Sequence, residues 1–225
     1  MNKRPNILYF MTDQHRADWL GCAGHPVVKT PNIDRLAERG TRFTNFNVTT
    51  PVCMPNRGAI FTGRYPSVNG ARHNGLPLPA NANTFVDLLR GAGYHTASIG
   101  KSHHQPFNDK PLTRADEDPV VNTDFPEALK PDGVDYIHEH PDSYDGVSFH
   151  EFPKPYYGFD HVRMVTQHSD QCGGHYLQWL RGQTNKWAEI RDRANQLPHD
   201  YTCPQAYRTA IPEELYPTSF IKEEA

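Results

Sequence analysis

Three short groups of polar residues have the types and spacing to perform chemistry together. Asp13-Gln14 offers a carboxylate and an amide oxygen, Cys53 precedes Arg57 by four residues, and Lys101-Ser102-His103 adds a cation and a proton carrier. Carboxylate and amide oxygens are hard ligands that suit Ca²⁺ or Mg²⁺. Arginine and lysine stabilise oxyanions, and histidine moves protons. Together these groups predict hydrolysis of a sulfate or phosphate ester, assisted by a divalent cation.

Each of these residues also has a simpler interpretation. A single cysteine is more often a small buried hydrophobic residue than a nucleophile. A lone lysine is usually solvated, His103 beside His104 is typical of a polar loop, and Asp13 is as easily a helix cap or turn residue. A tyrosine-phosphatase loop requires arginine six residues after the cysteine, where this chain has Ala59. Only the joint placement of the three groups favours a functional site.

The segment 53–62 is expected to form the helix that positions the cysteine. Pro55 suits the first turn of a helix, where its missing N–H costs nothing, and Gly63 is a suitable end. Cys53 therefore lies at a helix N-terminus, where free N–H groups and the helix dipole favour an anion. Arg57 lies one turn further along and presents a planar cationic fork.

The chain around this helix alternates between expected strands and helices, which predicts an α/β sheet. Residues at the carboxyl ends of parallel strands line the crevice where α/β proteins bind ligands. The three polar groups are all predicted to follow strands. Strands are expected at 6–12, 42–48, 95–99 and 161–167, and further helices at 31–39, 85–91, 174–180, 184–195 and after 218.

Composition bounds the class of protein. The chain has 225 residues, a net charge of −3 and 36% hydrophobic residues, and its mean hydropathy is −0.74. These values fit one domain or part of a larger one, and they indicate no nucleic-acid partner. No stretch approaches the roughly 20 apolar residues of a membrane span. Four widely separated cysteines and the lack of a secretory leader predict a reducing compartment, the cytoplasm.

The region 104–160 differs from the rest because it is rich in Pro, Asp, His and Gly and shows little periodicity. We interpret it as a loop-rich insertion on the substrate side of the domain. His138, His140 and His150 lie in it. We weigh a metal site there at about one in ten against solvated surface histidines, because such a short motif specifies little.

The motif around Cys53 carries a resemblance to a known family. The sequence CMPNRGAIFTGR at 53–64 resembles the C-x-P-x-R…TGR signature of the sulfatases, which belong to the alkaline-phosphatase-like superfamily. PNILYFMTDQHRADWLGCAGHP, KTPNIDRLAERGTRFTNFNVTTPVC, GYHTASIGKSHH and YYGFDHV resemble further family segments. The resemblance covers the whole chain and is densest over 5–104. It implies a mixed, mostly parallel sheet flanked by helices.

The resemblance implies a specific nucleophile. Cys53 would be oxidised to formylglycine by a separate maturation enzyme that reads the linear motif, and the hydrated aldehyde would attack the sulfate ester. Arg57 would hold this hydrated aldehyde. Lys101 would bridge it to the sulfate, and His103 would orient or deprotonate it. Aryl, choline-type and sugar sulfates all remain compatible substrates.

The resemblance also implies a metal site. Asp13, Gln14 and the modified Cys53 would be ligands, and Asn74 lies where relatives often contact substrate or metal-bound oxygen. Many relatives have a second aspartate where this chain has Gln14, so Ca²⁺, Mn²⁺ and Mg²⁺ all stay open. The glutamine form also occurs in phosphonate monoester hydrolases, which makes a phosphonate or phosphate ester hydrolase the alternative. Lys101 and His103 favour the sulfatase branch.

Besides Gln14, the length of the chain also differs from the family pattern. Its remaining metal ligands and substrate-binding lysine and histidine come from a later part of the domain. We therefore interpret residues 1–225 as the N-terminal part of one sulfatase catalytic domain, a fragment that is catalytically incomplete by itself. The isolated chain is expected to bind metal poorly and turn over little. Its oligomeric state is left open.

Overall fold

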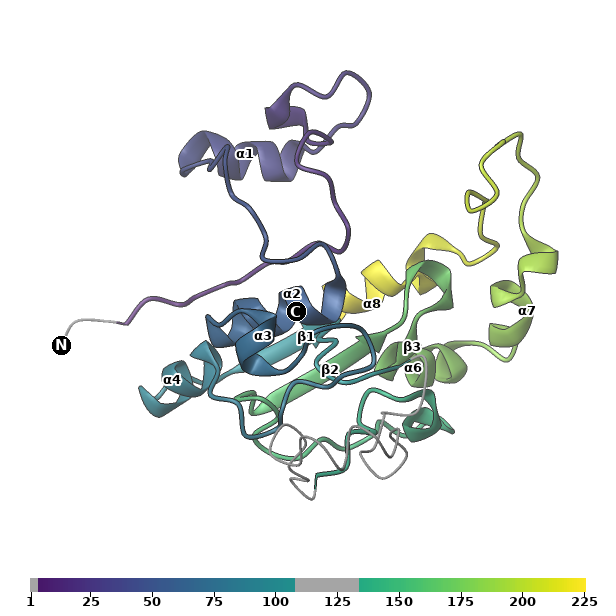
Figure 1. The fold of residues 1–225 in the computed structure, drawn as a ribbon. Helices are drawn as coiled ribbons and strands as arrows, with labels where there is room; N and C mark the ends of the chain where they lie inside the picture. Colours follow the sequence, from purple (N-terminus) through teal and green to yellow (C-terminus); the bar gives the residue numbers. More distant parts are fainter. Residues whose placement is uncertain (1–3, 108–133) are drawn as a thin grey trace, which may run out of the picture. The chain divides into compact units, whose positions relative to one another are not determined.

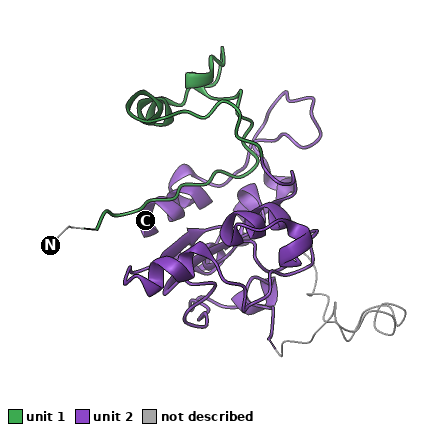
Figure 2. Ribbon diagram, turned by 60° about the vertical axis from the view of Figure 1, so that its left-hand side comes forward, with its two compact units in different colours: residues 1–47 green, residues 48–225 purple. Residues whose placement is uncertain are grey.

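The computed structural model describes residues 4–107 and 134–225. The chain divides into two compact units, Met1–Asn47 and Val48–Ala225, which Figure 2 colours green and purple. Each unit is described by itself. None of the helices in the described ranges is long and apolar enough to cross a membrane.

Unit 1 is organised around α1, Pro31–Arg39, preceded by a 3-10 helix at Gly21–Ala23. The predicted helix is therefore confirmed, but the Thr30 side chain does not cap it. Thr30 Oγ1 instead donates to Asp34 Oδ1 at 2.8 Å and accepts from Gly21 N at 2.9 Å. A Cβ at Gly21 would lie too close to the Asp34 carboxylate, so the Asp34 side chain would have to move for a larger residue to fit.

Two predicted strands, 6–12 and 42–48, are wrong, because neither segment forms a strand. A strand is stabilised by ladder hydrogen bonds to a neighbour. The sheet of the described residues contains only β1, β2 and β3, and none of them pairs with either segment. Leu8 and Phe10 remain 88% and 75% exposed, and Phe46 is 80% exposed. An apolar run alone therefore did not indicate a strand.

The sheet of unit 2 has the order β1-β2-β3 (Figure 1). Strand β1 (Ala97–Gly100) runs parallel to β2 (His161–Thr166), with Ala97 opposite His161. The short β3 (Gly173–Gly174) runs antiparallel to the end of β2. The strands predicted at 95–99 and 161–167 are confirmed, and the sheet is mixed, with helices beside it.

The helices of unit 2 follow the prediction with two exceptions, α3 (Pro66–Asn69), which was not predicted, and the helix predicted at 184–195. The longer ones are α2 (Cys53–Thr62), α3 (Pro66–Asn69), α4 (Phe85–Gly91), α6 (His175–Gln183), α7 (Trp187–Arg191) and α8 (Pro217–Glu224). Short 3-10 helices lie at Pro141–Tyr144, Ser169–Gln171, Arg193–Asn195 and Glu213–Leu215. The helix predicted at 184–195 is broken, because Asp192 adopts an extended backbone and caps the 3-10 turn through Ala194 N.

A core cluster joins β2, α6 and α8. Its buried residues are Val165, Cys172, Tyr176, Leu180 and Phe220. The last two and Tyr176 are fully buried, and burying such side chains contributes about 1.5–3 kcal/mol each. The helix predicted after Pro217 therefore completes the packing around β2.

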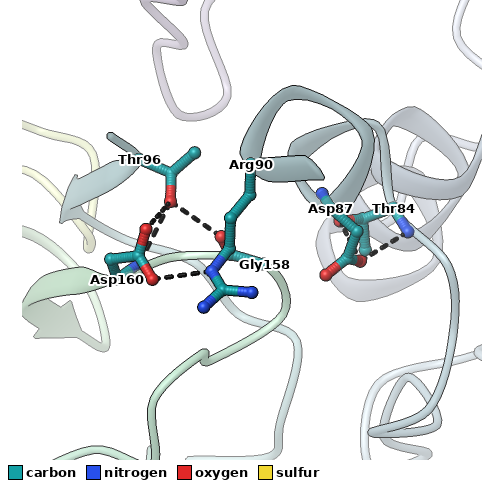
Figure 3. A network of polar contacts seen from close by, with 6 residues as sticks. All are labelled: Thr84, Asp87, Arg90, Thr96, Gly158 and Asp160. Atoms are coloured by element: carbon teal, nitrogen blue, oxygen red, sulfur yellow. Dashed lines mark hydrogen bonds and ion pairs between the residues drawn. The ribbon is translucent and has the colours of Figure 1, made fainter. Parts of the chain in front are cut away.

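A polar network holds α4 against the amino ends of β1 and β2 (Figure 3). Thr84 and Asp87 form a capping box at the start of α4. Thr96 Oγ1 donates to Gly158 O at 2.7 Å and also lies 3.1 Å from Asp160 N, which donates to it. Arg90 Nε, from α4, donates to the Asp160 carboxylate at 2.7 Å.

The loop-rich region predicted at 104–160 is described in part, since 108–133 lie outside the described residues. Its described part contains a single short 3-10 helix, Pro141–Tyr144. Its role as a substrate-side insertion stays a prediction.

Candidate active site

Cys53 is the first residue of α2 and is half-buried. The side chain of Asn74 meets this helix end. Asn74 Oδ1 accepts from Met54 N at 3.2 Å and lies 3.5 Å from Cys53 Sγ. It satisfies one of the free N–H groups of the first turn, as an N-cap residue would. Asn74, predicted as a substrate contact, thus lies beside the nucleophile position in the structure.

Two glycines allow α2 to hold the cysteine where it is. A Cβ at Gly58 would lie 3.3 Å from the Ala71 Cβ, so a larger residue would push the helix away from this segment. Gly63 has φ 65° and its N–H donates to Ala59 O at 2.8 Å, which ends the helix. The sequence prediction of this helix and of its end is confirmed.

Arg57 joins α2 to the turn that follows β1. Its side chain is 6% exposed, and Nη1 donates to Lys101 O at 2.5 Å. A buried guanidinium needs such acceptors, because desolvation of an unpaired charge is costly. The contact brings two of the predicted polar groups, Cys53–Arg57 and Lys101–His103, into one site.

The turn after β1 has a strained backbone. His103 has φ 55°, a left-handed conformation that residues other than glycine rarely adopt. Its side chain is 3% exposed and stacks on the Phe107 ring with centroids 3.8 Å apart. Burial, together with the nearby cations Lys101 and Arg57, lowers the pKa of His103 to about 2. The imidazole is therefore neutral at physiological pH and suited to accept a hydrogen bond, but it is a weak base.

Lys101 contacts His168, a residue that was not predicted from the sequence. Its Nζ lies 3.2 Å from His168 Nδ1, to which the ammonium donates, and 5.3 Å from the Phe107 ring centroid. His168 follows β2 as Lys101 follows β1, and the two parallel strands end at the same edge. The polar run Gln167-His168-Ser169 after a predicted strand was the available signal.

A surface cavity of about 270 Å³ opens beside His168. Its walls also include Gln167, Arg193 and Tyr207. Arg193 lies over the Tyr207 ring at 4.8 Å, which holds both side chains in place.

A second layer of buried polar groups lies behind the turn. His104 and Glu139 are 1% and 0% exposed. Burial lowers the pKa of His104 to about 3 and raises the pKa of Glu139 to about 7. Among the described residues, five buried side-chain atoms lack a hydrogen-bond partner: His103 Nδ1, His104 Nδ1 and Nε2, Glu139 Oε2 and Thr166 Oγ1. All five lie at or behind the carboxyl ends of β1 and β2.

The histidines considered for a metal pair with each other instead. His138 Nδ1 lies 3.0 Å from His150 Nε2, and burial lowers the pKa of both rings. His140 lies beside Asp142 at 3.5 Å. The described residues contain no group of three or more His, Cys, Asp or Glu side chains placed to hold a metal ion. The surface interpretation is wrong for His138 and His150, which are partly buried and bonded.

Asp13 and Gln14 belong to unit 1, and both are exposed. Gln14 N donates to Asp13 Oδ1 at 3.1 Å. Their oxygens fit the chemistry of a hard cation, but such ions take about six to eight ligands. Two side chains would fill only part of that shell, so their role as metal ligands stays a prediction.

The architecture places the chain in the alkaline-phosphatase-like α/β class. The phosphonate monoester hydrolase of Agrobacterium radiobacter, a solved structure, covers 98% of this chain with a TM-score of 0.64 and 26% identity, and the match spans 37% of that protein.

The chain belongs to the sulfatase family, whose family model matches residues 5–176. An ulvan-active sulfatase of Formosa agariphila is 45% identical over 100 residues, which are 44% of this chain and 20% of that protein. An N-acetylglucosamine-6-O-sulfatase of Bacteroides thetaiotaomicron is 42% identical over 101 residues, which are 45% of this chain and 18% of that protein. The matched part thus spans about a fifth of these relatives.

Proposed function

We propose that this protein hydrolyses a sulfate monoester with a nucleophile derived from Cys53. The observation that carries the proposal is the contact of Arg57 with Lys101 O, which joins the sulfatase motif helix to the Lys101–His103 turn. Membership of the sulfatase family supports the same activity. The sulfate ester substrate is thereby part of the proposal, and its alcohol group stays open.

The residues of the turn have distinct roles in this proposal. The ammonium of Lys101 stabilises negative charge on the sulfate oxygens, in a setting where burial strengthens electrostatic interactions. The neutral His103 ring orients the nucleophile by accepting a hydrogen bond from it, because its low pKa makes the ring a weak base. Arg57 fixes the position of the turn relative to the start of α2 and presents positive charge next to Cys53.

The modification of Cys53 is part of the proposal. A maturation enzyme that reads the motif would convert the thiol to formylglycine, and this group supplies a hydrated aldehyde as nucleophile. The half-buried position at the first residue of α2 suits an anionic centre, since the free N–H of the first helical turn points there. Asn74 Oδ1, 3.5 Å from Sγ, is placed to accept a hydrogen bond from a hydroxyl at this position.

Asp13 and Gln14 are the proposed side-chain ligands of unit 1 for Ca²⁺, Mn²⁺ or Mg²⁺. When bound, such an ion supplies a Lewis acid that polarises sulfate oxygen. The amide of Gln14 brings no charge, so the pair contributes a single negative charge. A cytoplasmic location is also proposed, because four widely separated cysteines are typical of a chain from a reducing compartment.

The test combines mass spectrometry with turnover. The full-length protein is co-expressed with a formylglycine-generating enzyme, and the peptide containing Cys53 is weighed before hydrolysis of an aryl sulfate is assayed. We expect the aldehyde mass and turnover together, and a Cys53→Ala variant that is inactive but folded. An unmodified thiol in an active protein would reject the proposed nucleophile, and an aldehyde without turnover would reject the activity.

A second candidate is a phosphonate or phosphate ester hydrolase on the same scaffold. The likeness to the Agrobacterium radiobacter enzyme over 98% of the chain favours it. Comparison of kcat/KM for an aryl sulfate and an aryl phosphonate separates the two candidates. We expect the sulfate to be preferred, because Lys101 and His103 resemble the sulfatase branch.

A third candidate, a catalytically incomplete fragment, concerns the isolated chain. Measurable hydrolysis by the purified 225-residue chain carrying the aldehyde would contradict it.

A further inference from the structure

Glu139 is a fully buried carboxylate whose hydrogen bonds go to the turn after β1. Its Oε1 accepts from His104 N at 3.0 Å and from Gln105 N at 3.3 Å. Tyr156 Oη donates to the same oxygen at 2.8 Å. The side chain is 0% exposed, so these donors take the place of water.

The turn that Glu139 binds cannot be held by its own backbone preference. His103 has φ 55°, and a left-handed conformation at a β-carbon-bearing residue persists only where the surroundings impose it. The acceptor for the two N–H groups directly after His103 is the carboxylate of Glu139. Arg57 fixes the other side of the turn through Lys101 O.

The chemistry of Glu139 is unusual for a purely structural residue. Burial raises its pKa to about 7, and the hydrogen bonds from Tyr156 and from the backbone of residues 103–105 only partly oppose this effect. Its Oε2 is one of the five unpartnered buried atoms among the described residues. A neutral amide or an apolar side chain would avoid the cost of burying a carboxyl group. Only Oε1 is hydrogen-bonded, and its two backbone donors belong to the turn. This arrangement indicates that Glu139 shapes the turn.

We infer that Glu139 is a positioning residue for the proposed sulfate ester hydrolysis. It binds the backbone of the Lys101–Gln105 turn and thereby sets where the His103 ring and the Lys101 ammonium lie. The inference rests on the proposed function, since the turn matters to catalysis only if Lys101 and His103 act on the substrate.

Two conservative variants distinguish the effect of side-chain length at position 139 from the effect of its charge. Glu139→Gln keeps the length of the side chain and an acceptor oxygen, whereas Glu139→Asp keeps the carboxylate but is one methylene shorter. We expect the Gln variant to keep kcat within about threefold and the Asp variant to lose at least tenfold in kcat, with a smaller change in KM, since misplacement of catalytic groups is costly. Thr96→Val is the matched control, because it removes buried hydrogen bonds at the opposite end of β1.

Hydrogen exchange gives a readout that does not depend on turnover. In the Asp variant, the amides of His104 and Gln105 should exchange at least tenfold faster than in the wild type, and in the Gln and Thr96→Val variants they should not. An Asp variant with wild-type kcat and exchange would overturn the inference, as would an equal loss of kcat in Thr96→Val. A wild-type protein that carries the aldehyde but is inactive would instead reject the proposed function.

Discussion

The two ends of the β1–β2 pair differ in how well their polar groups are bonded. At the amino ends, Thr96, Asp160 and Arg90 bond one another and the Gly158 carbonyl (Figure 3). At the carboxyl ends, all five unpartnered buried atoms of the described residues lie on or behind the strand ends. The polar groups described at the amino ends of these two strands are therefore hydrogen-bonded, whereas several buried polar atoms at the carboxyl ends are not.

The backbone shows the same contrast. Among the described residues, three of the four non-glycine residues with positive φ lie within three positions of the end of β1 or β2: His103, Gln167 and Ser169. Strained backbone and unpartnered buried polar groups cost about 1–3 kcal/mol each. Proteins retain such costs where function requires them, and pay by satisfying polar groups elsewhere. The contrast thus favours the carboxyl end as the place of the proposed active site, on energetic grounds that do not depend on a motif.

The sharpest test of the contrast compares a cation at each end. Lys101→Ala is expected to lower kcat/KM about 10³-fold, or about 4 kcal/mol, because it removes a charge aimed at the sulfate oxygens. Arg90→Ala, which breaks an ion pair whose side chains are 46% and 35% exposed, should leave kcat/KM unchanged. Steady-state kinetics with an aryl sulfate measures both. Equal losses in the two variants would show that the ends do not differ in function.

The amino end also depends on a glycine for its stability. Gly158 has φ 87°, and a Cβ there would lie 2.7 Å from Asp87 N and 2.9 Å from Val86 C, both backbone atoms. We expect Gly158→Ala to lower the free energy of unfolding by about 3 kcal/mol. Gly146 has the same φ but an added Cβ would meet nothing within 4 Å, so Gly146→Ala should cost only about 1 kcal/mol. Urea denaturation distinguishes them, and equal losses would mean that backbone strain alone matters.

The sequence predicted the local parts of this picture and missed the non-local ones. Pro55 and Gly63 bound α2 because helix ends follow from the residues within one turn. The apolar run 6–12 looks like a strand, but no local pattern can supply the neighbour that a strand needs. Glu139 reaches a turn 34 residues away in sequence, and nothing near it in the chain indicates that contact.

The pH dependence of the free energy of unfolding should also distinguish the buried histidines from the buried Glu139. Burial lowers the pKa of His103, His104 and His175 to about 2, 3 and 4 from 6.5, so these rings take up protons on unfolding. The contribution of these three neutral rings to the free energy of unfolding is fully present above pH 6.5, and it is lost as the pH falls below that value. Glu139, with its pKa raised from 4.5 to about 7, is protonated in the folded state and opposes this loss between those values. The net uptake near pH 5.5 is about two protons, which lowers the free energy of unfolding by roughly 2–3 kcal/mol per pH unit.

Glu139→Gln removes the opposing proton, so the same slope should rise to about three protons. Urea midpoints at pH 6.5 and 5.5 for the wild type and the variant measure the difference. A variant with the wild-type slope would show that Glu139 is already ionised in the folded protein at pH 5.5.

The smallest expected effect concerns His168, which the sequence analysis did not predict. His168 Nδ1 accepts from Lys101 Nζ at 3.2 Å, so it orients the ammonium without carrying the charge itself. We expect His168→Ala to lower kcat/KM about tenfold, or about 1.4 kcal/mol, with little change in stability because the ring is exposed. His161→Ala is the control, since His161 is an exposed histidine at the amino end of the same strand. If both variants kept wild-type kinetics, the carboxyl end of β2 would contribute no side chain to the site, and the functional asymmetry would belong to the turn after β1 alone.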